Sequence, residues 1–139
     1  MPDAFEILEH TADIGFRAWG DTREHMFENA ALALESVAIE LDGVEPKRPF
    51  PIAAAGEDEE SLLVNWLSEV LYYLDGRRVA MSRFQVDYLD AHRVSGKAFG
   101  EPRDPVRHPA KVIVKGVTYH QLKIAEEGGR WRADVYLDI

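Results

Sequence analysis

The spacing of apolar positions changes along this 139-residue chain, and each change predicts a different element. Residues 4–18 alternate apolar and polar positions with an interruption at 10–13, which predicts two short strands joined by that segment. Apolar residues then recur at helical spacing over 27–37 and, more clearly, over 62–74. After Gly76 the period returns to two, which predicts several further strands.

Residues near both predicted helices are suited to act as caps. Asp21 or Thr22 can accept hydrogen bonds from the first N–H groups of the first helix, and Glu24 would form a capping box with Asp21. Acidic residues 57–60 suit the N-terminal end of the second helix, where the helix dipole favours negative charge. Gly76 suits its C-terminal cap. The helix limits are therefore predicted from local chemistry.

The second half of the chain predicts paired strands and turns. Two strands join near Asp90-Ala91, residues 127–129 form a hairpin turn, and the last strand runs over 130–139. Residues 112–114 fit either a short strand or a helical turn. The order of elements predicts a single α+β domain over residues 1–139, with two amphipathic helices packed on a mostly antiparallel β-sheet.

The last strand also predicts a cluster of acidic groups. Strand alternation turns Trp131, Ala133, Val135, Leu137 and Ile139 toward the core and leaves Asp138 on the other face, beside the terminal carboxylate of Ile139. Asp13 would add a third oxygen ligand if the fold brings it near, and such ligands suit Ca²⁺, Mg²⁺ or Mn²⁺. The alternative is that Asp13 caps a turn and Asp138 is solvated.

Composition limits the classes of function. With 16 basic and 25 acidic residues the net charge is −9, which disfavours autonomous nucleic-acid binding, because that binding depends on Lys and Arg neutralising phosphates. The chain has no cysteine, so disulfides, thiolate metal sites and cysteine nucleophiles are excluded. We find no signal-like or membrane-spanning apolar segment and expect a soluble protein of the reducing cytoplasm.

A polar patch and two histidines provide further candidates. Lys115 could contact a phosphate or a carboxylate, with Gly116 allowing close backbone approach; the alternative is a bulge with an exposed lysine. His10 and His120 could bind metal, carry protons or pack structurally, and Thr118 lies in the same patch. A small hydrolase using Asp13, Asp138 and His120 lacks a visible nucleophile–base pair, so we expect a protein that is not an enzyme.

Four segments in the same order resemble the archease family along the full length of the chain. These are His10-Thr11-Ala12-Asp13-Ile14, the helical stretch at 62–73, Val114-Lys115-Gly116-Val117-Thr118-Tyr119-His120, and Val135-Tyr136-Leu137-Asp138-Ile139. Each segment is weak evidence alone, whereas four in the right order with an Asp-Ile end are specific. Gly116 departs from the alanine that is common at this position in the family.

The resemblance implies a non-catalytic accessory protein of RtcB-type RNA ligases. These ligases join RNA ends in tRNA splicing and repair, pass through a guanylylated histidine, and need GTP and Mn²⁺. Archeases stimulate guanylylation and multiple turnover and broaden nucleotide use. The family's metal site corresponds to Asp13, Asp138 and the Ile139 carboxylate, and its functional lysine to Lys115. The alternative is a chaperone or specificity modulator of an RNA-modifying enzyme such as a tRNA cytosine methyltransferase.

Overall fold

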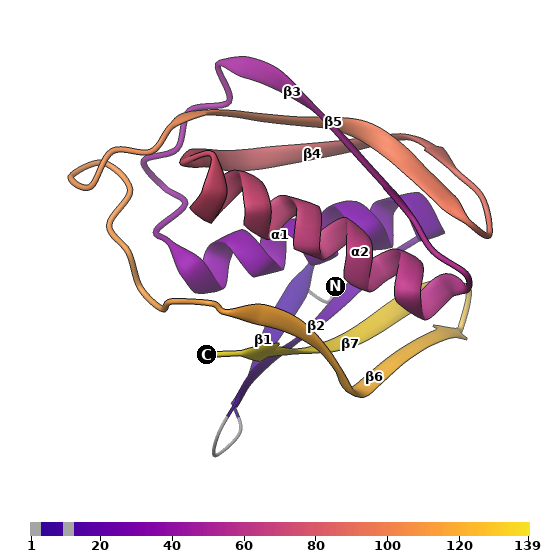
Figure 1. The fold of residues 1–139 in the computed structure, drawn as a ribbon. Coiled ribbons are helices and arrows are strands. Elements are labelled where there is room, and N and C mark those ends of the chain that lie inside the picture. Colours follow the sequence, from indigo (N-terminus) through magenta and orange to yellow (C-terminus); the bar gives the residue numbers. More distant parts are fainter. Residues whose placement is uncertain (1–3, 10–12) are drawn as a thin grey trace.

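Two antiparallel sheets enclose two helices, which gives the molecule three layers in the computed structural model (Figure 1). The structure describes residues 4–9 and 13–139. One sheet has four strands in the order β1-β2-β7-β6, and the other has three in the order β3-β5-β4. The strands are β1 (Phe5–Glu9), β2 (Asp13–Gly20), β3 (Arg48–Ala55), β4 (Val79–Leu89), β5 (Arg93–Pro102), β6 (Gly116–Glu127) and β7 (Arg130–Asp138). The predicted α+β class is confirmed, with the strands divided between two sheets instead of one.

The helix α1 (Arg23–Ala38) is buried on more than one side because it packs against β2 of one sheet and β4 of the other. Its small residues allow close approach by both sheets. The helix α2 (Glu59–Leu71) lies beside α1, between β3 and β6, and continues into the π-helical turn η1 (Tyr72–Gly76). The fully buried Trp66 joins the two helices, because its indole N–H donates a hydrogen bond to the carbonyl oxygen of Phe27 at 3.1 Å.

The observed caps differ in part from the predicted ones. Thr22 caps α1 by accepting a hydrogen bond from the His25 backbone N–H at 3.1 Å, so the predicted box between Asp21 and Glu24 is not the cap. At α2, Asp58 and Ser61 form the capping box. After η1 the chain turns through Arg78, whose φ of 58° lies in the left-handed region, two residues beyond the predicted cap at Gly76.

Alternation in β7 is confirmed at its centre and wrong at its ends. Ala133, Val135 and Leu137 are fully buried, as predicted. Trp131 is only half-buried. Ile139 is 38% exposed and lies beyond the last residue of β7. The hairpin between β6 and β7 turns at Gly128 and Gly129, whose positive φ angles explain why glycine stands at both positions.

Residues 103–115, which we call the strap, connect the three-stranded sheet to the four-stranded sheet along one side of the molecule (Figure 1). The strap is neither helix nor strand at 112–114, contrary to both predictions for that segment. Hydrogen bonds attach it to the end of α1, from Glu40 N–H to the Pro109 carbonyl and from Lys111 N–H to the Ala38 carbonyl. No helix within the described residues is long and apolar enough to cross a membrane.

Candidate functional site

Asp13 and Asp138 lie directly opposite each other across the antiparallel pair β2–β7. Directly opposed residues have Cα atoms about 4.5–5.5 Å apart and side chains on the same face of the sheet. Ile14 pairs with Leu137, whose side chain is fully buried on the face toward the helices, so the two aspartates belong to the outer face. The fold therefore brings the two predicted acidic residues together, although 124 residues of chain separate them.

No basic side chain within residues 4–9 and 13–139 forms an ion pair with either aspartate. Asp13 is half-buried and Asp138 is exposed. Like charges directly opposite one another in a sheet are destabilising. A hard divalent cation bound by both carboxylates would remove that repulsion, and carboxylate oxygens are ligands that such cations prefer. The two side chains therefore fit a divalent cation chemically.

A complete cation site needs ligands beyond these two. Within the described part of the chain, no three His, Asp or Glu side chains gather closely enough to hold a metal ion. Ile139 follows Asp138 directly, and its main-chain carboxylate, if free, is a further oxygen donor next to the pair. His10, the other candidate from this end of the chain, lies outside the described residues.

Acidic residues elsewhere on the outer face of this sheet are paired with a basic side chain. Arg17, two rungs further along β2 on the same face, donates to Asp134 at 2.8 Å and pairs with Glu6 at 3.3 Å. The hydrogen bond with Asp134 is the main reason that the pKa of Arg17 is raised above its usual value. The acids there are neutralised by an arginine, whereas no described basic side chain neutralises the acids of the Asp13–Asp138 rung.

Lys115 borders the acidic pair through its backbone. Its N–H donates to the Asp138 carbonyl oxygen at 2.7 Å, and its side chain is exposed and forms no ion pair with a described residue. Gly116 lies opposite Asp138 on the other side of β7, and a Cβ placed on it would meet nothing within 4 Å. Gly116 therefore has open space around it, and its role in allowing a ligand to approach the backbone closely stays a prediction. The bulge in β6 lies later, between Thr118 and Lys123.

Thr118 and His120 lie beside the next rung of the same face. Thr118 pairs with Tyr136, and its hydroxyl accepts a hydrogen bond from the His120 N–H at 3.1 Å. The ring of His120 meets the edge of Tyr136 at a centroid distance of 6.2 Å. Tyr136 in turn covers Gly15, where an added Cβ would come within 2.8 Å of the ring. An aromatic contact thus places His120 near the paired Asp13 and Asp138, which we call the acidic rung.

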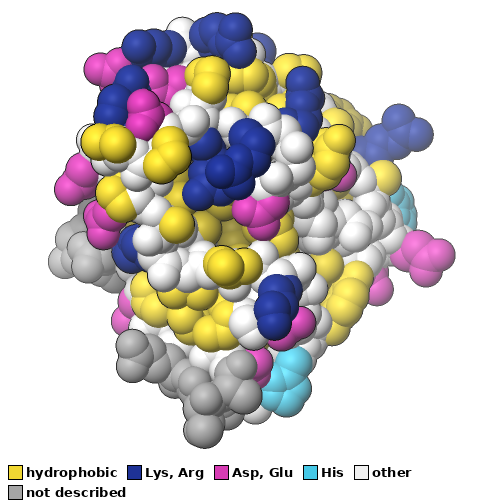
Figure 2. All heavy atoms as spheres, turned by 60° about the vertical axis from the view of Figure 1, so that its left-hand side comes forward, with side chains coloured by type: hydrophobic (Ala, Val, Ile, Leu, Met, Phe, Trp, Pro, Cys, Tyr) yellow, Lys and Arg dark blue, Asp and Glu magenta, His cyan; other side chains and the backbone are white. Residues whose placement is uncertain are grey.

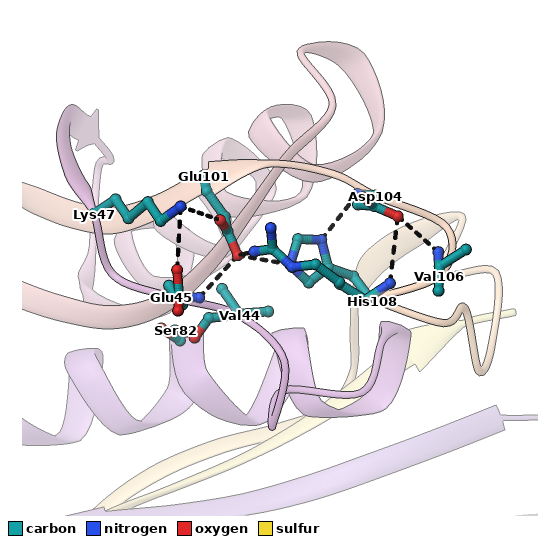
Figure 3. Close-up of polar contacts among 9 residues, drawn as sticks. Val44, Glu45, Lys47, Ser82, Glu101, Asp104, Val106 and His108 are labelled. Atoms are coloured by element: carbon teal, nitrogen blue, oxygen red, sulfur yellow. Dashed lines mark hydrogen bonds and ion pairs between the residues drawn. The ribbon is translucent and has the colours of Figure 1, made fainter.

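A second polar cluster lies at the start of the strap and was missed from the sequence (Figure 3). The buried Glu101 accepts hydrogen bonds from the Glu45 N–H at 2.9 Å, from Arg107 and from His108 Nε2 at 2.9 Å. Because the Asp104 N–H donates to Nδ1 of His108, the proton of the neutral ring is on Nε2. The bond from Arg107 is the main cause that lowers the pKa of Glu101 to about 2. In the sequence, the alternation of acids, bases and prolines over 101–109 was the feature that could have indicated this cluster.

The structure also buries one carboxyl group without a hydrogen-bond partner. Glu35 of α1 is fully buried, and neither of its carboxyl oxygens has a hydrogen bond within the described chain. Burial raises its pKa well above the usual value. The Met81 backbone N–H, which is near the carboxyl group but outside hydrogen-bond geometry, and the Arg103 guanidinium lower it only in part. The sequence gave no sign that Glu35 is buried without a hydrogen bond. A single polar residue in an amphipathic helix is expected to face solvent.

Similarity to known proteins covers nearly the whole chain. A sequence model described as the Archease protein family matches residues 5–139. The chain is 42% identical to "Protein archease" of Methanopyrus kandleri and 43% identical to that of Pyrococcus furiosus, with 97% of this chain and 99% and 98% of those proteins covered.

Solved structures agree with these relatives. The solution structure of Methanobacterium thermoautotrophicum protein 1598 superposes with a TM-score of 0.82 at 35% identity, covering 98% of this chain and 99% of that one. A Thermotoga maritima crystal structure, described as an archease and possible chaperone, shares the fold with a TM-score of 0.62 at 20% identity, covering 95% of this chain and 94% of that one. With the family match over residues 5–139, the similarity establishes that this chain belongs to the archease family.

Proposed function

We propose that this protein is a divalent-cation-binding accessory protein that stimulates guanylylation and multiple turnover of an RtcB-type RNA ligase. Asp13 and Asp138 hold the cation in this proposal, together with the carboxylate of Ile139. The observation that carries it is the pairing of Asp13 with Asp138 in register across β2 and β7, with no basic partner in the described residues. Family membership supports the ligase as partner.

The cation, when bound, would supply positive charge for the phosphates of a nucleotide in the ligase site. Asp13 and Asp138 bind and orient it at the end of a rigid sheet. Lys115, joined to Asp138 by its backbone, supplies an exposed ammonium group next to the same point, for a phosphate or a ligase carboxylate. The net charge of −9 steers the molecule toward a basic RNA-binding face.

The test is guanylylation of an RtcB-type ligase by GTP across limiting Mn²⁺ concentrations. We expect the parent protein to lower the Mn²⁺ concentration needed, and Asp13→Asn and Asp138→Asn to lose most of this stimulation. Glu126→Gln is the matched control, because it removes one exposed acidic charge from β6 outside the acidic rung. Stimulation by both Asn variants at the parent level would refute the proposal.

A direct binding measurement separates the cation site from the ligase. Calorimetric titration with Ca²⁺, Mg²⁺ and Mn²⁺ in the absence of ligase should show weaker binding in Asp13→Asn and Asp138→Asn. Adding one residue after Ile139 moves the terminal carboxylate away, so an unchanged affinity in that variant excludes this group as a ligand.

The chaperone alternative requires an exposed apolar surface and no cation. The large exposed apolar residues of the described chain are dispersed over several elements, with the two most exposed, Val106 and Ile113, both on the strap. An aggregation assay of an RNA methyltransferase with and without chelator distinguishes the two functions. Suppression that persists in chelator would favour the chaperone.

A further inference from the structure

A groove of about 380 Å³ lies between the end of α2, the turn η1 and the strap, on the side of the molecule shown in Figure 2. Its lining is mostly apolar, including Ile39, Leu74 and Val112. The charged side chains that line it are Arg78, Arg103 and Asp75. Figure 2 shows Lys and Arg side chains surrounded by hydrophobic ones on this face. The groove therefore combines an apolar lining with positive charge, although the chain as a whole is acidic.

The two arginines differ in how they are neutralised. Arg103 is mostly buried and lies 3.7 Å from Asp75 and 3.5 Å from the Leu74 carbonyl oxygen, at the negative end of the helix. Arg78 is exposed, and its guanidinium has no hydrogen bond or ion pair within the described residues. Its backbone is held in the left-handed region, and its carbonyl accepts the Arg103 N–H at 2.9 Å. Arg78 thus presents a positive charge that has no ion-pair partner among the described residues.

The strap side of the groove contains backbone groups that have no hydrogen bond to a described residue. Hydrogen bonds attach the strap at Lys111 and Lys115, but the N–H and C=O groups of 112–114 form none with any described residue. Ile113 projects from this stretch with 77% of its surface exposed, while Val114 is buried. A free backbone edge beside an apolar groove is the arrangement to which an extended peptide adds as a further strand.

We propose that this groove binds an extended acidic segment of a partner protein. The segment pairs with the free backbone of 112–114, places an apolar side chain next to Ile113, and places a carboxylate on Arg78. This proposal deepens the proposed function, and it rests on that function for the identity of the partner. The groove is connected to the cation site because the strap ends at Lys115, whose N–H is bonded to the Asp138 carbonyl oxygen. The ligase would then be held at the groove while the acidic rung faces its active site.

An acidic peptide fits these features better than a nucleic acid. A phosphate would satisfy Arg78, but it would leave Ile113 and the backbone groups of 112–114 without partners. The net charge of −9 also opposes a polyanion, whereas a short acidic segment with apolar neighbours presents only local charge. Binding of RNA at the groove is therefore the competing outcome of the test.

The first arm measures affinity for the RtcB-type ligase by calorimetry in EDTA, so that no cation contributes. Arg78→Gly removes the guanidinium and relieves the positive φ, and Ile113→Ser removes the apolar contact. We expect each to weaken binding at least tenfold. Arg83→Gln, an exposed charge change on β4, and Val106→Ser, an equally exposed position outside the groove, should stay within twofold. Parent-like affinity of both groove variants overturns the proposal.

The second arm is independent of the ligase. An NMR titration uses the peptide acetyl-Val-Glu-Val-Asp-Val-amide, its Gln/Asn analogue, and a short oligoribonucleotide as probes. We expect chemical-shift changes at Arg78 and 112–114 with the acidic peptide but not with the other two probes. No change at millimolar peptide, or a change with the oligoribonucleotide instead, overturns the proposal. Peptide binding, with no ligase binding either in EDTA or in Mn²⁺, supports the groove as a peptide site and refutes the ligase as partner, and with it the proposed function. If Asp138→Asn still binds the ligase in EDTA but no longer stimulates guanylylation, the result supports both the groove and the proposed function.

Discussion

Glu35→Leu should stabilise this protein, although it alters a fully buried position. Both carboxyl oxygens of Glu35 lack hydrogen-bond partners in the described structure, and its neighbours along α1 are apolar. Leucine has a similar size and no polar atoms, so it fills the same space without desolvating a carboxyl group. The expected result follows from removing a buried group whose hydrogen bonds with water are not replaced.

The size of the effect follows from the cost of an unsatisfied buried polar group, about 1–3 kcal/mol. In a domain of this size, each kcal/mol raises Tm by roughly 3–5 °C, between the ranges for smaller and larger domains. Burial raises the pKa of Glu35 in the folded state, so the folded protein binds its proton more tightly than the unfolded chain does. The contribution of Glu35 to stability is therefore greatest below about pH 4.5 and falls as pH rises above it.

Urea unfolding of the parent, Glu35→Leu and Glu35→Gln between pH 4 and 8 tests both the stabilisation by leucine and its dependence on pH. The advantage of leucine should grow with pH above about 4.5, where the unfolded parent ionises. Glutamine cannot ionise, so it should also lose this pH dependence, but it retains unsatisfied polar atoms and should not match leucine. A leucine variant less stable than the parent at pH 8, or parallel pH profiles for all three proteins, would refute the reasoning.

Three further predictions concern stability and packing. The pKa of Glu101 is lowered to about 2, so its stabilisation is complete above the ordinary value of 4.5 and is lost as pH falls toward 2; Glu101→Gln should flatten this acid limb in unfolding experiments. Gly100→Ala should destabilise severely in thermal melts, because its Cβ would lie 1.9 Å from the Ala80 carbonyl oxygen, whereas Gly116→Ala, which has open space, should leave Tm within about 2 °C. Trp66→Phe should lower stability by about 0.5–1.5 kcal/mol in urea titrations, because it removes the buried hydrogen bond from the indole N–H to the Phe27 carbonyl.

Several local features could be predicted because they depend on residues close in sequence. The apolar stripe that begins at Leu62 predicted α2 correctly, although the helix changes to the π-helical turn η1 after Leu71. Gly128-Gly129 supplies the positive φ angles of a tight hairpin. Alternation in β7 correctly assigned Asp138 to the face away from Leu137, because successive side chains in a strand must alternate. The failures were at ends, such as Ile139, where no neighbour enforces the pattern.

The sequence by itself determined most of the helices and strands, the face of the central residues of β7, and the acidic residues at the two ends of the chain. Only the tertiary structure decided that the strands form two sheets around α1, that Asp13 stands opposite Asp138, and that Glu101 contacts His108. It also left the buried carboxyl group of Glu35 without a hydrogen bond among the described residues, and it placed Arg78 beside an apolar groove. The physical reason is that backbone period depends on neighbours in the chain, whereas strand pairing and burial of a charge depend on contacts between distant segments.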